Sequence, residues 1–147
     1  MEYAVVLTDL LRLKPMLFHG AEVTADHLLA SCAVPPIFDQ RRIGGRLYTD
    51  GGLLCALPVW AALQLGADRV IALDAMATMP SSALRYATKG LRKLSRFRPQ
   101  PESAAVVRLC PSRPLGTIRE MLEWREDRVR EWMDLGEADG DQINISI

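Results

Sequence analysis

Hydrophobic residues occur along the chain in two patterns: short apolar runs, and apolar positions spaced three or four residues apart. The runs predict strands over residues 3–7, 69–73 and 104–109, and a hairpin over residues 43–48. The helical spacing predicts helices over residues 24–32, 58–65 and 117–137. Because strands and helices alternate, an α/β fold with a mostly parallel sheet covered by helices is favoured. The nearly continuous apolar run at residues 69–73 also predicts a strand buried on both faces.

A strongly basic segment follows this last strand. Residues 75–101 contain no acidic side chain and six basic ones. Apolar residues recur among them at helical spacing, which predicts a basic amphipathic helix. One interpretation is peripheral contact with an anionic membrane. The other is a solvated helix that packs its leucines on the sheet, weakened by roughly 1 kcal/mol at Gly90 relative to alanine. The candidates for membrane contact are Arg85, Lys89, Arg92, Lys93 and Arg96.

Composition and charge fit a single domain without a nucleic-acid partner. The chain has 147 residues, of which 49% are hydrophobic and only 6% aromatic, as suits one aliphatic α/β core. Its 18 basic and 18 acidic residues cancel, so the net charge gives no support to nucleic-acid binding. No leader pattern and no apolar stretch of membrane-spanning length is apparent. Three widely spaced cysteines predict free thiols and a cytoplasmic location, to which the basic helix adds peripheral membrane attachment.

Neither a metal site nor a cofactor site is expected. The cysteines and the two histidines lack the close spacing of zinc ligands, and the glycine pairs belong to no nucleotide-binding pattern. A Ser-His-Asp triad would require His19 or His27. We predict that His19 lies in a loop and His27 in a helix, as surface or core residues.

The candidate for chemistry is Asp50, which follows the strand-like pair at residues 47–48 and precedes Gly51 and Gly52. The two glycines are expected to take positive φ angles in a sharp turn around a functional side chain. Aspartate and glycine are also common in turns for purely local reasons, so this motif alone does not establish a catalytic role.

A second pattern precedes this turn and gives it a family context. The helix predicted over residues 24–32 ends in an Ala-Ser-x-Ala-x-Pro-x-x-Phe pattern. Its members are Ala30, Ser31, Ala33, Pro35 and Phe38. Together with Asp50-Gly51-Gly52, this pattern resembles the patatin-like phospholipases over residues 3–75. The resemblance implies a three-layer α/β/α fold and hydrolysis of lipid esters by a serine-aspartate dyad. Asp50 would be the proton acceptor, supported by Gly51 and Gly52.

The sequence departs from the family pattern in two places. The glycine-rich oxyanion loop and the Gly-x-Ser-x-Gly elbow of the family's N-terminal part have no counterpart, and Ser31 occupies a structural position. Ala56 stands where the family usually carries asparagine. The resemblance therefore implies the C-terminal part of one domain, with the motif in residues 1–75. Residues 76–147 would supply its basic segment, a strand and a closing helix.

Two functions follow as hypotheses. In the first, the chain is the aspartate half of a lipid acyl hydrolase in lipid degradation, and an upstream segment, or less expectedly another chain, supplies the serine. In the second, it is a truncated or degenerate relative without catalysis that acts as a binding or interaction domain. In either case the chain alone is expected to be inactive. A sheet without its first strands would also expose an edge and an apolar face, which predicts self-association.

Overall fold

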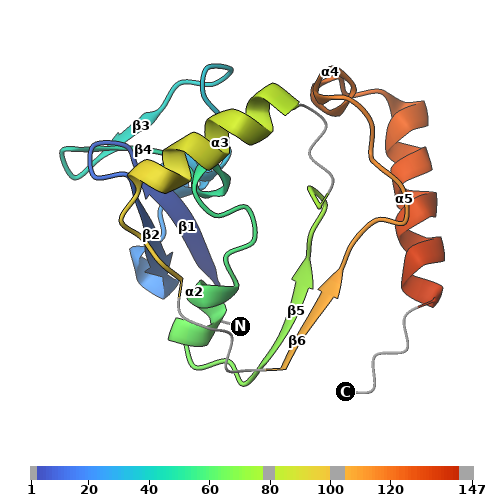
Figure 1. The fold of residues 1–147 in the computed structure, drawn as a ribbon, viewed down its shortest axis with the longest axis horizontal. Helices are drawn as coiled ribbons and strands as arrows, with labels where there is room; N and C mark the ends of the chain where they lie inside the picture. The colour runs from blue at the N-terminus through green and yellow to red at the C-terminus, as the bar shows by residue number, and fades with distance from the viewer. Residues whose placement is uncertain (1–2, 78–81, 100–104, 143–147) are drawn as a thin grey trace.

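The fold combines two sheets with helices that connect and flank them (Figure 1). The computed structural model describes residues 3–77, 82–99 and 105–142. The strands are β1 (Ala4–Asp9), β2 (Lys14–His19), β3 (Arg41–Ile43), β4 (Arg46–Asp50), β5 (Arg69–Leu73) and β6 (Ala105–Leu109). The helices are α1 (Ala25–Ser31), α2 (Val59–Gln64), α3 (Ser82–Leu94), α4 (Ile118–Leu122) and α5 (Glu126–Asp141), with short 3₁₀ turns η1 (Gly20–Glu22) and η2 (Gly51–Leu53). The predicted α/β class is confirmed.

The larger sheet has four strands in the order β2-β1-β4-β3, and its neighbouring strands are antiparallel. Parallel pairing occurs between β5 and β6, in a separate two-stranded sheet. In the described part of the chain, parallel pairing is therefore limited to this pair, and the sheet that carries Asp50 is antiparallel. Strand β2 was not predicted, because Pro15 in this segment argues against a strand unless it lies at an edge. β2 is indeed an edge strand of this sheet.

The core lies between the four-stranded sheet and α1, which packs against β1, β3 and β4. Leu7, Ala30 and Tyr48 form its buried centre. Phe18 on β2 completes it, with its ring edge-on to Tyr48 at a centroid distance of 5.6 Å. Such aromatic contacts add to the stabilisation from burial of apolar surface. This core fixes the ends of β1 and β4, where Asp50 lies.

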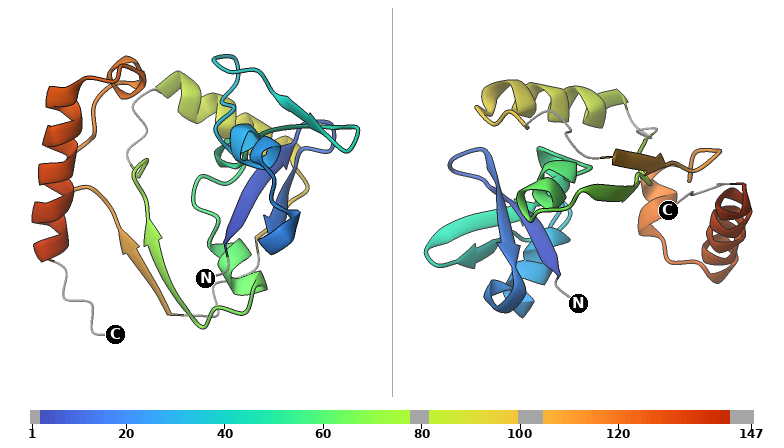
Figure 2. Two further views of the ribbon diagram at one scale, coloured as in Figure 1. Left: turned by 180° about the vertical axis from the view of Figure 1, so that it is seen from behind. Right: turned by 90° about the horizontal axis from the view of Figure 1, so that it is seen from below.

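The second sheet is less covered than the sequence predicts. Ile71 is 52% exposed and Leu73 is 73% exposed, whereas Ala72 between them is buried. The prediction that this strand is buried on both faces is therefore wrong. The physical reason is visible in Figures 1 and 2, where β5 and β6 bridge from α2 to α5 and no described helix lies flat against their open face.

The prediction of one long helix over residues 117–137 is also wrong in one respect, because the structure has two helices there, α4 and α5. Glu123, at the end of α4, has an extended backbone with φ −89° and ψ 108°, and Arg125 caps the next helix. Trp124 between them is 91% exposed. α5 contacts the segment that follows β6 through Trp132, whose indole N–H donates to the Leu115 carbonyl at 2.9 Å.

Candidate active site

Asp50 lies where β4 ends and η2 begins, beside the buried strand β1. In the pairing of these strands, Leu7 lies opposite Asp50 and is fully buried. The Asp50 backbone N–H donates to the Ala33 carbonyl at 3.3 Å, and the Thr49 hydroxyl donates to the same oxygen. The segment after α1 therefore fixes the end of β4. The Ala33 carbonyl therefore joins the Ala-Ser-x-Ala-x-Pro-x-x-Phe pattern to the Asp50-Gly51-Gly52 motif.

The Asp50 carboxylate is half-buried and is held by one backbone donor. Its Oδ1 accepts a hydrogen bond from the Gly52 N–H at 2.6 Å. Burial raises the pKa of Asp50 above its ordinary value of 3.8, and the hydrogen bond from Gly52 opposes that rise. Within the described part of the chain, Oδ2 has no hydrogen-bond partner. A carboxylate with one oxygen fixed, the other open and a raised proton affinity has the properties required of a general base.

Gly51 and Gly52 are required in this turn for a reason other than the one predicted. Neither has a positive φ angle, so that prediction is wrong. A Cβ atom on Gly51 would instead lie 2.2 Å from the carbonyl oxygen of Val6 on β1. A Cβ atom on Gly52 would lie 2.9 Å from Oδ1 of Asp50. The glycines therefore allow the turn to approach β1 and allow the carboxylate to fold back onto the Gly52 N–H.

The described serine side chains have other partners than Asp50. The Ser31 hydroxyl donates to the Leu28 carbonyl at 2.7 Å, inside α1. The Ser95 hydroxyl donates to the Leu13 carbonyl at 2.6 Å. In the part of the chain that the structure describes, no serine is hydrogen-bonded to the Asp50 carboxylate. Of the predicted serine-aspartate dyad, the described residues therefore place only the candidate base, Asp50, and no serine in contact with it.

His27 lies in α1 and His19 lies at the end of the edge strand β2. His27 is buried against Phe18, with ring centroids 4.4 Å apart. Its Nδ1 accepts a hydrogen bond from the Thr24 backbone N–H at 3.1 Å, which caps the start of α1. His19 ends β2 and is exposed. These placements agree with the predicted surface or core roles, although His19 belongs to a strand and not to a loop.

The sequence did not single out Asp9, which is buried at the end of β1. Its Oδ1 accepts hydrogen bonds from the backbone N–H groups of Leu11 and Arg12, each at 3.1 Å. Its Oδ2 lies 3.6 Å from Nη1 of Arg46, an ion pair too long for a hydrogen bond. These contacts close the turn between β1 and β2, so Asp9 stabilises the sheet. The available signal was the Thr8-Asp9 pair directly after the predicted strand at residues 3–7, because aspartate favours turns.

A cavity of about 540 Å³ begins directly after the Asp50 turn. Residues 54–57 form one wall, and Ala56, at the position of the family's asparagine, is exposed. Burial raises the pKa of the Cys55 thiol, and Arg92 opposes that rise. The charged residues that line the cavity are Asp74, Arg92, Arg98 and Arg108. The surroundings of the turn thus carry an excess of positive charge.

Within residues 3–77, 82–99 and 105–142, no group of three histidine, cysteine or acidic side chains could hold a metal ion. None of the helices in those ranges combines the length and the hydropathy needed to cross a bilayer. The three cysteines are unpaired, as predicted.

Comparison with known proteins confirms the resemblance. A family model described as patatin-like phospholipase matches residues 6–63. An uncharacterized NTE family protein of Mycobacterium bovis is 37% identical over 72 residues. Two Mycobacterium tuberculosis proteins of the same description, from strains CDC 1551 and H37Rv, match to the same extent. The match covers 49% of this chain but only 20% of each relative, so the chain spans a minor part of their length.

Proposed function

We propose that this chain, of which residues 6–63 match the patatin-like phospholipase family model, is the aspartate-bearing part of a lipid acyl hydrolase and that Asp50 is its general base. One observation carries the proposal: Asp50 stands at a sterically fixed turn with a raised pKa and one open carboxylate oxygen. The reaction class is hydrolysis of carboxylic esters of lipids, which the family assignment supports.

The reaction requires a serine from a segment outside this chain, and Asp50 moves its proton. As the serine oxygen attacks the ester carbonyl, its proton passes to the open Oδ2 of Asp50. Collapse of the tetrahedral adduct releases the alcohol, which takes this proton, and leaves the acyl group on serine. Asp50 then accepts a proton from the attacking water, and returning it to the serine oxygen releases the fatty acid. The Gly52 N–H keeps Oδ1 engaged throughout, so that Oδ2 faces the reaction.

The substrate is proposed to be a phospholipid or lysophospholipid. Arginine side chains bind phosphate oxygens through paired hydrogen bonds. Three arginines line the cavity that adjoins the Asp50 turn. A phosphate bound there would lie beside residues 54–57, which directly follow the Asp50 turn in the sequence, and this supports a phospholipid over a neutral lipid.

Complementation tests this function. The segment that precedes the matched region in the Mycobacterium tuberculosis relative would be joined to this chain, and hydrolysis of a short-chain phospholipid would be measured. Asp50→Asn is expected to lower kcat by about 10²-fold or more, as loss of a general base does. Asp26→Asn, at an exposed position of α1, is the matched control and should not change kcat. Equal kcat for the Asp50→Asn variant and the parent chimera would contradict the proposal.

A non-catalytic binding role is the second candidate function, and the exposed apolar side chains of β5 favour it. In this role the chain would associate with a partner or with itself through that face. Intact mass after treatment with a fluorophosphonate probe tests both candidate functions for the chain as it stands. No mass shift is expected, because no described serine is hydrogen-bonded to Asp50. A stoichiometric shift on one serine would contradict both the aspartate-half function and the binding role.

The proposed location is the cytoplasm, with peripheral attachment to anionic membranes through α3. The free cysteines favour the cytoplasmic location. The basic residues Arg85, Lys89, Arg92, Lys93 and Arg96 favour the peripheral attachment. Recovery of the tagged chain with the membrane fraction, reversed by high salt, is the expected result in cell fractionation.

A further inference from the structure

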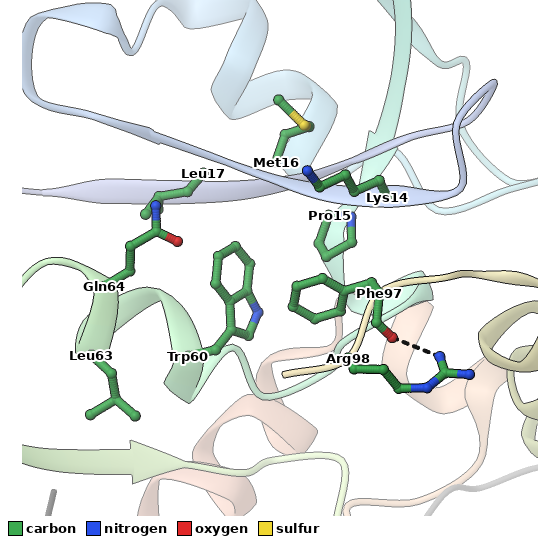
Figure 3. A pocket seen from close by; sticks show the side chains of 9 residues that line it. All are labelled: Lys14, Pro15, Met16, Leu17, Trp60, Leu63, Gln64, Phe97 and Arg98. Carbon is green, nitrogen blue, oxygen red and sulfur yellow. Dashed lines mark hydrogen bonds between the residues drawn. The ribbon is translucent and has the colours of Figure 1, made fainter. Parts of the chain in front are cut away.

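A second cavity, of about 490 Å³, lies between β2 and α2 (Figure 3). Pro15, Met16 and Leu17 of β2 line one side, and Trp60 and Leu63 of α2 line the other. Phe97, from the segment after α3, closes it, with its ring edge-on to Trp60 at a centroid distance of 5.1 Å. Figure 3 shows these two rings beside each other between β2 and α2. The volume and the apolar lining are those of a small-molecule site.

The segment that carries Phe97 is fixed in place by hydrogen bonds. The Ser95 hydroxyl is buried and donates to the carbonyl of Leu13, which precedes β2. The Phe97 backbone N–H donates to the same hydroxyl at 3.2 Å. Nη1 of Arg98 donates to the carbonyls of Ser95 and Phe97 at 2.9 and 2.8 Å. The wall of the cavity is therefore built by contacts between residues far apart in the sequence.

An adjoining cavity of about 500 Å³ shares Lys14, Phe97 and Arg98 with the first. Its charged lining residues are Arg12, Lys14, Arg96 and Arg98, and no acidic residue lines either cavity. None of these four side chains forms an ion pair with another described residue. Four like charges around one space repel each other unless an anion joins them.

We propose that the two cavities together bind a single-chain lipid with a small anionic headgroup, a carboxylate or a phosphate monoester. The acyl chain lies against Trp60, Leu63 and Phe97, and the headgroup lies among Arg12, Lys14 and Arg96. Asp50 lines neither cavity. Phe97 and Arg98 also line the cavity proposed for the substrate phosphate, but the headgroup residues Arg12, Lys14 and Arg96 do not. This proposal does not depend on the proposed function.

Calorimetric titration of the full chain with 12-carbon ligands below micelle formation tests this site. Laurate and dodecyl phosphate are expected to bind one per chain, and dodecanol at least tenfold more weakly, because it lacks the charge. Decanoate should bind more weakly than laurate by roughly fourfold per methylene, which is 0.8 kcal/mol converted at 1.4 kcal/mol per factor of ten. Equal affinity for dodecanol and laurate would overturn the proposal, and so would the absence of saturation.

Paired variants locate the headgroup. Lys14→Gln with Arg96→Gln is expected to lower the affinity for laurate at least tenfold. Lys89→Gln with Lys93→Gln removes the same charge from exposed positions of α3 that line neither cavity, and should change the affinity less than twofold. Equal losses in both pairs would show general electrostatic attraction and would overturn the site.

If the variant with Lys14→Gln and Arg96→Gln fails to fold, photolabelling of the unaltered chain still tests where the ligand binds. A 12-carbon acid with a diazirine near its tail is expected to label the peptide that contains Trp60 and Leu63. Labels spread over α3 and α5 instead would overturn the proposal. Preference for laurate or for dodecyl phosphate in the titration identifies which anionic headgroup the site takes.

Discussion

A methyl group on Gly51 would collide with the backbone of β1. The Val6 carbonyl oxygen cannot move away without breaking the sheet, because β1 is paired on both sides. We therefore predict that Gly51→Ala lowers the free energy of unfolding by about 1–3 kcal/mol, as overpacking does. Urea denaturation followed by circular dichroism measures this change.

Gly90 provides the contrasting control, because the same substitution meets no atom within 4 Å there. It lies inside α3, where alanine stabilises a helix by roughly 0.5–1 kcal/mol relative to glycine. The two Gly→Ala variants should therefore shift stability in opposite directions. A Gly51→Ala variant as stable as the parent chain would contradict the steric account of the turn.

The raised pKa of Asp50 predicts a pH dependence of stability. The native state binds a proton more tightly than the unfolded chain, whose aspartate has the ordinary pKa of 3.8. Stability from this group is therefore fully present below that pH and is lost as the pH rises through the native pKa. Asp50→Asn removes the ionisation while its amide oxygen can still accept from the Gly52 N–H. It should be more stable than the parent at pH 7, and this difference should shrink in acid.

Chemical denaturation of both proteins at pH 7 and below the ordinary pKa of 3.8 measures this effect. Asp26→Asn is the control, since its side chain is exposed and its substitution should not produce the same trend. A gain in stability combined with a loss of activity is common where a functional group is held in an unfavourable environment. An Asp50→Asn variant that is less stable at pH 7 would contradict the effect of burial.

The sequence was sufficient to predict which residues form the turn, but not why glycine is required at positions 51 and 52. Asp50, Gly51 and Gly52 follow an apolar pair, and this order was sufficient to place them between a strand and the next helix. The clash with Val6 depends on which strand lies beside β4, which is a long-range contact. The pairing of His27 with Thr24 is local and was still missed, because histidine replaces the usual acidic residue of a capping box.

At the element scale, α3 presents both charge and exposed apolar surface to solvent. Tyr86 is 66% exposed and Leu94 is 72% exposed, whereas Thr88 and Ser95 are buried. Thr88 of α3 thus lies inward, whereas Tyr86 and Leu94 lie outside among the basic residues. On this arrangement we propose that α3 contacts an anionic membrane.

Liposome flotation tests this contact. We predict that vesicles with anionic lipid recover more of the chain than neutral vesicles, since each basic residue near the surface contributes about 1 kcal/mol. Lys89→Gln with Lys93→Gln should lower the recovery. Arg130→Gln, on the exposed side of α5, is the control and should have little effect. Equal recovery by both kinds of vesicle would leave α3 as a solvated helix.

Element boundaries followed the sequence wherever local signals were strong. Thr24 caps α1, and Gly66, with a φ of +89°, follows the end of α2, so both helices lie where the apolar spacing placed them. The break between α4 and α5 had no glycine or proline to mark it. Apolar spacing continues through Trp124, although that side chain is exposed. Periodicity alone therefore could not separate two helices from one.

At the scale of the whole molecule, the four-stranded sheet is well covered while the β5–β6 sheet is not. The class of the fold could be predicted because it depends on the order of elements. The strand pairings could not, because they depend on contacts between distant segments. The antiparallel pairing of β1 with β2 and β4 places the Asp50 turn in a compact unit (Figure 2). The second sheet contacts α2 through β5, and its apolar side chains Ile71 and Leu73 are exposed.

This open face predicts self-association of the isolated chain. Val107 on β6 is 40% exposed, and it adds to the exposed apolar surface of Ile71 and Leu73 on the neighbouring strand. β5 is paired with β6 along one edge, and its other edge has no strand partner in the described ranges. An unpaired edge beside an apolar face can pair with a second copy. We therefore expect dimers or larger assemblies by light scattering at micromolar concentration.

Substitution on that face decides whether it is responsible. Ile71→Thr with Leu73→Thr keeps residues that favour strands while it reduces the apolar surface, so the chain should shift toward the monomer. Leu11→Thr is the matched control, because Leu11 is 80% exposed in the turn between β1 and β2, away from this sheet. A parent chain that is monomeric with a cooperative melt would contradict the prediction. Equal association of the control and the double variant would place the contact elsewhere on the molecule.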